Sequence, residues 1–380
     1  MTPGLEVKVC TNCAKSRRKC GKQRPLCLRC RTRGLSCHYP RVRPTSFVPL
    51  REDTSDANKT ANEITITPSP LELCFPFVDD SLASWWFASP STWAIDSASC
   101  SPTTNTSDFS ASSLDRALRK VLGWLGEWVE TGTCPFMHQQ LYLDCFPASI
   151  EGAYLTLSAY LRRTPLNAPV VERIIESRAT GLVAAGLNSD SGPFSTLENL
   201  VQVQALLVYQ CIGLSSGSIR LRRLAECHIP VMEAWIMSLM QQASYMFTSS
   251  IDSFFASPDL RSIPRHNHLW YTWIVVESVR RIWLVVAIIQ GMYKVLAITP
   301  TSLIASPFMG GTLFTSRKGF WEAGTAGAWE KECSERNAGM VRLTETEKLF
   351  EMVPREEICE FAKLVLECTY GVEWCEMRGV

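Results

Sequence analysis

Hydrophobic residues in the carboxyl-terminal two thirds of the chain recur with the spacing of amphipathic helices. Between Ser113 and Gly132 one such face is formed by Leu114, Leu118, Val121, Leu122, Leu125 and Val129. Further helices are predicted over residues 148–163, 167–186, 200–212, 219–247 with a break near Pro230, 268–296 and 356–370. Ser195 and Glu198 form a capping-box signature ahead of the 200–212 helix. Runs of alternating β-branched residues are scarce, so residues 113–380 are predicted to form a mainly all-α domain.

Residues 44–112 lack this periodicity and are rich in Ser, Thr and Pro, which predicts a disordered linker. One aromatic and acidic island interrupts it over residues 71–95. Two interpretations of the island stay open. Its composition is typical of an activation segment that docks on a transcription coactivator. Alternatively its aromatic residues pack on the following helical domain, which is the interpretation we favour.

Charge divides the chain in the same way. The full sequence of 380 residues carries a net charge of only +1, and its length allows two or three domains. Residues 1–43 nevertheless hold twelve Lys or Arg and one acid, which leaves 26 basic and 36 acidic residues in the remainder. A basic amino-terminal end on an acidic body is typical of a nucleic-acid-binding domain joined to a soluble one.

Neither export nor a membrane location is predicted. The stretch before Cys10 has no apolar signal-peptide core. The most apolar run, residues 282–289, is far shorter than the ~20 residues a membrane span needs, so a buried core helix is expected there. The 16 cysteines are then expected to be reduced thiols.

Six of these cysteines form an internal repeat. The spacing is C-x2-C-x6-C-x6-C-x2-C-x6-C, through Cys10, Cys13, Cys20, Cys27, Cys30 and Cys37. Short helices are expected over residues 11–19 and 28–34. Four thiolates fill the tetrahedral shell of one zinc ion, so six can hold two zinc ions if two sulfurs are shared. A disulfide framework, or one zinc with two spare thiols, would explain neither the repeat nor the basic residues between Cys13 and Cys20. His38 is not needed as a ligand.

The run CTNCAKSRRKCGKQRPLCLRC, followed by Cys37, resembles the zinc binuclear cluster domain of fungal transcription regulators. The resemblance implies two structural zinc ions bridged by Cys10 and Cys27. It also implies that the first helix enters the major groove of double-stranded DNA and reads a CGG-like triplet. Arg17 stands at the base-reading position, and Lys15, Arg18 and Lys19 are expected on phosphates.

The sequence departs from the family pattern near the base-reading position. Ala14 and Ser16 stand where basic residues are common, and Arg17 replaces the usual lysine. These departures put the exact triplet in doubt, but not the mode of binding.

Part of the helical half is similar to the regulatory region of the same regulators, over residues 203–235, 270–296 and 319–329. Its most distinctive feature is Trp273 with the run Glu277-Ser-Val-Arg-Arg281. Trp, Glu and Arg at helical spacing favour a core with a buried ion pair over a ligand site.

We therefore predict a nuclear regulator of RNA polymerase II genes, of the kind that governs fungal pathway gene clusters. The predicted domains are a DNA-binding domain (1–43), a linker (44–112) and a regulatory domain (113–380). Arg41 and Arg43, with the basic run 15–19, fit a nuclear import signal. No sustained heptad repeat is visible, so the sequence does not establish a homodimer.

Two alternatives belong to other functional classes. A DNA-bound repressor or scaffold would have the same DNA-binding domain (1–43). It would differ only in which proteins the rest of the chain recruits. A serine hydrolase would use Ser215, which lies in a G-x-S-x-G run, but that motif requires a parallel sheet that the sequence does not predict. No enzyme is expected.

Overall fold

The computed structural model describes residues 9–16, 18–22, 27–33, 35, 37–38, 86–94, 111–143, 145–187, 195–249, 254–257, 260–297, 312–342 and 346–380. Contacts between Cα atoms divide the chain into two compact units, residues 1–73 and 74–380. We call the described part of the first unit the head and that of the second unit the body.

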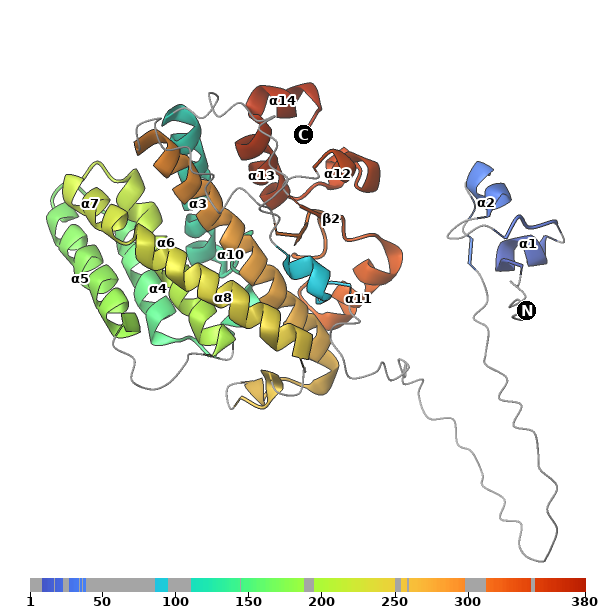
Figure 1. The fold of residues 1–380 in the computed structure, drawn as a ribbon, viewed down its shortest axis with the longest axis horizontal. Coiled ribbons are helices and arrows are strands. Elements are labelled where there is room, and N and C mark those ends of the chain that lie inside the picture. Colours follow the sequence, from blue (N-terminus) through green and yellow to red (C-terminus); the bar gives the residue numbers. More distant parts are fainter. Residues whose placement is uncertain are drawn as a thin grey trace, which may run out of the picture. The chain divides into compact units, whose positions relative to one another are not determined.

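The head contains two short helices, α1 (Thr11–Lys15) and α2 (Leu28–Thr32), each preceded by a cysteine as the N-cap residue (Figure 1). Both are shorter than predicted. In α1 the hydroxyl of Ser16, the C-cap residue, donates to the carbonyl of Asn12 at 2.7 Å. The chain leaves the helix there, and Cys20 returns to the other cysteines.

The body is a bundle of long helices (Figure 1). Its first part consists of α3 (Ala111–Thr131), α4 (Ala148–Leu161), α5 (Ala168–Leu187), α6 (Thr196–Ser215), α7 (Ile219–Cys227), α8 (Ile229–Ser249) and α10 (His268–Ala297). Two 3-10 turns, η4 (Gln139–Leu141) and η6 (Arg265–Asn267), precede α4 and α10. The predicted all-α class is confirmed for the described residues, and each predicted helix of this region is present.

Helices α6 and α10 lie at the centre of the body. Residues 203–214 of α6 and 270–290 of α10 are buried without interruption. A helix that is hydrophobic on all sides is stable only when neighbours surround it. Here α6 packs on α3, α4, α5, α7 and α8, while α10 packs on α3, α6, α8 and α11. The run 282–289 is therefore a core segment, and no described helix is long and apolar enough to span a membrane.

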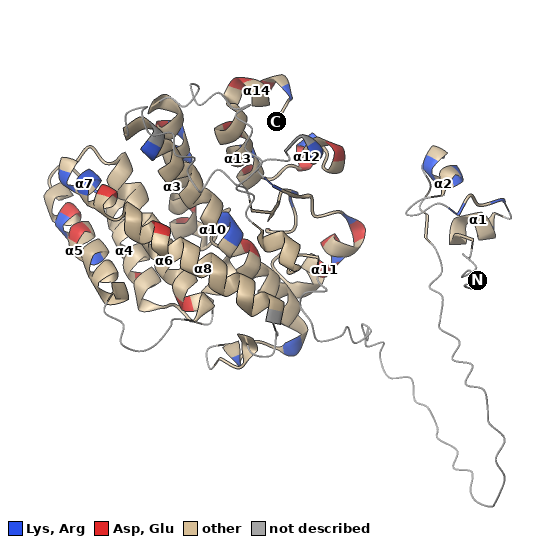
Figure 2. Cartoon of the chain, viewed as in Figure 1, with Lys and Arg blue, Asp and Glu red and all other residues tan. Residues whose placement is uncertain are grey.

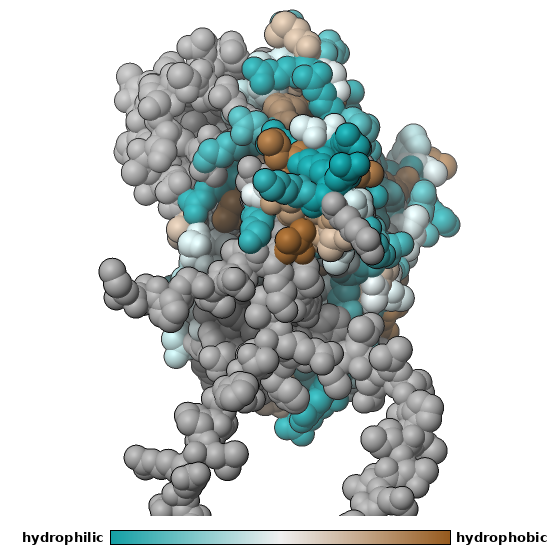
Figure 3. All heavy atoms as spheres, turned by 90° about the vertical axis from the view of Figure 1, so that its right-hand side faces the viewer, coloured by the Kyte–Doolittle hydropathy of each residue, from teal (hydrophilic) through white to brown (hydrophobic). Residues whose placement is uncertain are grey.

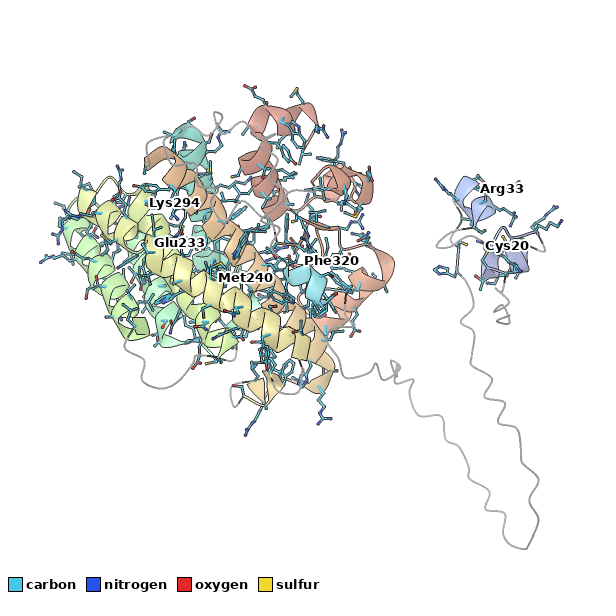
Figure 4. All side chains as sticks on the ribbon, in the orientation of Figure 1. Cys20, Arg33, Glu233, Met240, Lys294 and Phe320 are labelled. Carbon is cyan, nitrogen blue, oxygen red and sulfur yellow. The ribbon has the colours of Figure 1, made fainter. Side chains whose placement is uncertain are left out.

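Helices α8 and α10 run side by side and are joined at one end by an ion pair between Glu233 and Lys294 (Figure 4). Met240 of α8 is buried in the same core. On the face shown in Figure 3 the described residues are mostly hydrophilic, with hydrophobic ones scattered among them. The buried apolar side chains of the body form one continuous core, and their removal from water is the main stabilising contribution to such a bundle.

Local sequence signals set several helix ends. Ser195 and Glu198 form the predicted capping box: the Ser195 hydroxyl accepts from the Glu198 amide at 3.2 Å, and the Glu198 carboxylate accepts from the Ser195 amide at 2.7 Å. Pro230 is the second residue of α8, where the missing amide proton costs no helical hydrogen bond.

The region after α10 is smaller and more irregular. It comprises β1 (Phe314–Thr315), α11 (Ala326–Glu335), β2 (Met340–Val341), α12 (Thr346–Met352), η9 (Arg355–Glu357), α13 (Glu360–Tyr370) and α14 (Val372–Met377). The two strands pair antiparallel, with Phe314 opposite Val341. The helix predicted over residues 356–370 is divided, because Ile358 pairs with Arg317 and the Cys359 amide donates to the Ser316 carbonyl at 2.8 Å.

A short segment of the predicted linker, residues 86–94, folds against the body and contains the 3-10 helix η2 (Pro90–Trp93). We call residues 86–94 the anchor segment. Phe87 is fully buried and Trp93 is 6% exposed. Packing of the aromatic island on the helical domain is confirmed for these residues. Except for residues 111 and 112, the rest of 44–112 lies outside the described residues.

Candidate metal centre and DNA-binding surface

The six cysteines of the repeat converge in the head. Two sets of four sulfur atoms lie within 4.8 Å of one another: Cys10, Cys27, Cys30 and Cys37 in one set, and Cys10, Cys13, Cys20 and Cys27 in the other. Cys10 and Cys27 belong to both sets. This is the sharing by which six thiolates complete two tetrahedra.

The distances between sulfurs fit zinc coordination. The Cys10–Cys27 and Cys10–Cys30 sulfurs are 3.8 Å apart, and the Cys13–Cys27 sulfurs are 3.7 Å apart. Four sulfurs at ~2.3 Å from one zinc ion lie about 3.8 Å from each other in a tetrahedron. A disulfide would require about 2.0 Å, and all six cysteines are free thiols. The geometry therefore fits metal ions and not a disulfide framework.

Backbone hydrogen bonds hold the sulfurs in place. The Cys13 amide donates to the Cys10 sulfur at 3.4 Å, and the Cys27 amide donates to the Cys37 sulfur at 3.3 Å. The Thr11 amide donates to the His38 carbonyl at 2.7 Å, which joins the two ends of the head. Each helix thus begins at a sulfur, as the CxxC spacing implies.

The buried core of the head consists of cysteines alone among the described residues. Without a metal the crowded thiols differ in acidity. A hydrogen bond from the Cys30 amide is the largest effect that lowers the pKa of Cys27 to about 6, whereas burial raises the pKa of Cys30. A domain with so little apolar surface needs metal binding to supply its folding free energy.

Basic residues lie on and between the two helices of the head (Figure 2). Lys15, at the end of α1, and Arg18 and Lys19 after it are all exposed. Arg17, the predicted base-reading residue, lies outside the described residues. On α2 and its C-cap, Arg31 and Arg33 are exposed as well, and Figure 4 shows Arg33 and Cys20 on the two halves of the head.

Arg29 has a role that spacing alone did not indicate. Its guanidinium Nη1 donates to the Ser16 hydroxyl at 2.8 Å and lies 3.6 Å from the Cys13 sulfur. It therefore links α2 to the end of α1. Residues that hold metal ligands in this way orient them and tune the metal site. In the sequence, the only sign of this role was the position of Arg29, two residues after the predicted ligand Cys27.

His38 is exposed, and the sulfur sets found among the described residues do not include it.

The distinctive polar residues of the body form a structural network and not an open site. Glu277 and Arg281 pair at 2.9 Å with side-chain exposures of 0% and 1%. Arg281 also donates to the carbonyls of Pro135 at 2.7 Å and Thr315 at 3.1 Å. The interpretation of this motif as core with a buried ion pair is confirmed.

Ser215 lies at the last position of helix α6, and not on a turn between a strand and a helix. Its hydroxyl donates to the Cys211 carbonyl at 2.6 Å. The sheet found in the described residues has two short antiparallel strands. A nucleophile elbow requires a parallel sheet instead.

Comparison with known proteins agrees with this geometry. Residues 8–46 match the fungal Zn(2)-Cys(6) binuclear cluster domain. The chain is 23% identical to "Transcription factor gsfR2" of Penicillium aethiopicum over 98% of this chain and 95% of that protein. No solved structure gives a significant match.

The head thus supplies a matching domain and a set of free cysteines suited to zinc, and similarity to a transcription factor extends along nearly the whole chain. The chain therefore carries a fungal Zn(2)-Cys(6) binuclear cluster domain ahead of a mainly helical body, and it is similar to a fungal transcription factor along nearly its whole length.

Proposed function

We propose that the six cysteines hold two structural zinc ions, with Cys10 and Cys27 as the bridging ligands. The observation that carries this proposal is the pair of four-sulfur sets with two shared members. Because sulfur fills every ligand position, the zinc ions organise the head and leave no open position for catalysis.

The head is then a sequence-specific reader of double-stranded DNA. The cluster presents α1, whose last residue is Lys15, and Arg18 and Lys19 follow shortly after it; all three side chains are exposed. Such cations contact phosphates and add affinity that falls with salt concentration. Arg17 is assigned to the guanines of a CGG-like triplet, since a guanidinium can donate to O6 and N7 together.

Residues 113–380, which make up most of the body, are the regulatory domain of a nuclear regulator of RNA polymerase II genes. The curated relative is named a transcription factor and aligns along the body as well as the head. A DNA-bound protein that recruits other proteins needs a stable folded surface. The buried helices α6 and α10 stabilise the domain that would provide it. The same proposal includes a role in a pathway gene cluster, assembly as a homodimer and a coactivator as partner.

Selection of random duplex DNA by the full-length protein, with zinc and after chelation, tests this function. We expect zinc-dependent enrichment of CGG-like triplets. Arg17→Ala should lose discrimination at the triplet by roughly 1–3 kcal/mol, whereas Lys19→Ala should weaken all sequences alike. An unchanged sequence preference in Arg17→Ala would contradict the base-contact assignment, and no enrichment from zinc-loaded protein would contradict specific recognition.

A DNA-bound repressor or scaffold remains the second candidate, because the body buries part of the aromatic island. Phe87 and Trp93 are packed in the core and are therefore not available to a coactivator in this fold. Fusing residues 44–380 to an unrelated DNA-binding domain distinguishes the two. Reporter activation favours the activator, and its absence, with the fusion shown to bind DNA, favours the repressor or scaffold.

A further inference from the structure

A cavity of about 410 Å³ lies in the body beside the start of α6. Its walls come from the first turns of α6, from residues 140–149 ahead of and within α4, and from the end of α8. Described residues of 254–263 and Tyr271 of α10 complete them. Sites for organic small molecules typically measure ~300–1,000 Å³ and lie between helices in bundles of this kind.

The walls of the cavity are mainly apolar. Rings and aliphatic chains are supplied by Tyr142, Val201, Met246, Phe254, Leu260 and Tyr271. Polar atoms come from a few uncharged side chains, among them Gln140, Gln202 and Ser257. An apolar lining with a small number of hydrogen-bonding groups is typical of a site that binds an organic molecule and orients it.

The lining also offers no positive charge. No Lys, Arg or His is among the described residues that line the cavity. Its acid, Glu198, is engaged in the capping box, where the Ser195 amide donates to the carboxylate at 2.7 Å. Burial raises the pKa of Tyr142 well above its usual value, and its hydroxyl donates to the amide oxygen of Gln204. Tyr142 is therefore neutral, and the one charged side chain that an anionic ligand would meet among the described lining residues is the Glu198 carboxylate.

The cavity is connected by packing to the anchor segment. Phe254, in its wall, contacts Phe247 of α8 edge-on, with ring centroids 5.0 Å apart. Phe247 in turn stacks on Trp93 of η2, with centroids 6.2 Å apart. A molecule in the cavity would touch Phe254, and Phe247 alone separates Phe254 from Trp93 of the anchor segment.

We propose that this cavity is a binding site for a neutral, mainly apolar small molecule. The inference is carried by the apolar lining, in which the described residues include no Lys, Arg or His. Packing from Phe254 through Phe247 to Trp93 connects the site to the anchor segment, so binding can affect the regulator. The inference does not depend on DNA recognition by the head.

Fluorescence titration of the full-length, zinc-loaded protein with N-phenylnaphthylamine tests the proposal. This probe is neutral and apolar, and its sulfonated counterpart, anilinonaphthalene sulfonate, differs chiefly in its negative charge. We expect saturable binding of the neutral probe at one site and weaker binding of the anionic one. Ser257→Phe, which directs a ring into the cavity from a half-buried position, should abolish binding of the neutral probe.

Ser177→Phe is the matched control, because Ser177 is exposed on α5 and does not line the cavity. It should bind like the wild-type protein. Should Ser257→Phe fail to fold, as judged by circular dichroism, Ser149→Phe places a ring in the lining from another segment of the chain. Absence of saturable binding, equal binding of both probes, or unchanged binding in a folded cavity-filling variant would each overturn the proposal. DNA selection is measured separately, so failure here leaves the proposed function intact.

Discussion

At the scale of single residues, Arg29 shows how a side chain outside the cysteine repeat supports the metal centre. It reaches from α2 to the Ser16 hydroxyl and the Cys13 sulfur. A hydrogen bond between a cation and a sulfur ligand stabilises the charge on that ligand and fixes its position. The neighbouring Arg31 is exposed on the same helix and makes neither contact.

We expect Arg29→Ala to lower the affinity of the head for zinc by roughly 10-fold or more, since changes next to metal ligands typically cost that much. Competition with a chromogenic chelator measures the effect. Arg31→Ala serves as the control and should retain the wild-type affinity. Equal losses in the two variants would show that only the total charge of the head matters.

His138 is a buried residue whose hydrogen bonds fix its charge. Its Nε2 donates to the Trp321 carbonyl at 3.1 Å, and its Nδ1 accepts from the Gln140 amide at 3.2 Å. One nitrogen donates and the other accepts, which is the pattern of a neutral imidazole. Burial lowers the pKa of His138 to about 4.

The stability of the body should therefore fall in mild acid. Because the pKa of His138 is lower in the folded state than the ~6.5 of the unfolded chain, the unfolded state takes up the proton first. The neutral His138 makes its full contribution to the free energy of unfolding above about pH 6.5. This contribution is lost progressively towards the folded pKa of about 4, by roughly 3 kcal/mol in all.

Urea unfolding followed by tryptophan fluorescence between pH 7 and pH 5 measures this dependence. All 12 tryptophans lie at residue 85 or later, so the signal reports on the body. His138→Gln should flatten the slope, and His266→Gln, a change at an exposed histidine, should leave it as in the wild type. The same slope in wild type and His138→Gln would contradict this assignment.

At the scale of elements, the anchor segment and helix α10 depend on one another. Arg280 is fully buried, and its Nη2 donates at 2.6 Å to both the Phe87 carbonyl and the Thr92 hydroxyl. Its guanidinium also lies 4.7 Å from the centre of the Trp93 ring. A buried charge is tolerated only when such partners compensate its lost hydration, so α10 requires the anchor segment to be in place.

Thr92→Val tests this dependence, because it keeps the shape of the side chain and removes one of the two acceptors of Arg280, leaving the Phe87 carbonyl. We expect a loss of about 1–3 kcal/mol in the free energy of unfolding of the body. Thr180→Val makes the same exchange at an exposed position of α5 and should have little effect. Urea unfolding measures both variants, and equal stability of the two would contradict the proposed role of the anchor segment.

At the scale of the whole molecule, the two units are stabilised by different means. The body has a continuous hydrophobic core that extends from Phe87 to Cys375. The described core of the head consists of cysteines. Metal binding is therefore expected to control the fold of the head and not that of the body.

Chelation of zinc should abolish DNA binding while leaving the body folded. Helical circular dichroism and tryptophan fluorescence are expected to stay near their zinc-loaded values, since both arise mainly from the body. Readdition of zinc should restore DNA binding. A large loss of helical signal on chelation would show that the two units are not independent in stability.

Much of this organisation could be predicted from local patterns in the sequence. Period-3.6 hydrophobicity located α3 to α8 and α10, and the capping box marked the start of α6, because these signals act over a few neighbouring residues. The repeated cysteine spacing predicted shared ligands for the same reason. Helices α11, α12 and α14 were missed, as they are short and depend on packing with distant parts of the chain.

The sequence by itself thus determined the helical class, the charge division and the cysteine repeat, all of which arise from the spacing of residues along the chain. Only the tertiary structure decided that Arg29 reaches the Cys13 sulfur, that the anchor segment covers Arg280, and that a mainly apolar cavity forms beside α6. Each of these joins side chains from separate elements. Their meeting depends on how the helices pack, which local sequence patterns do not specify.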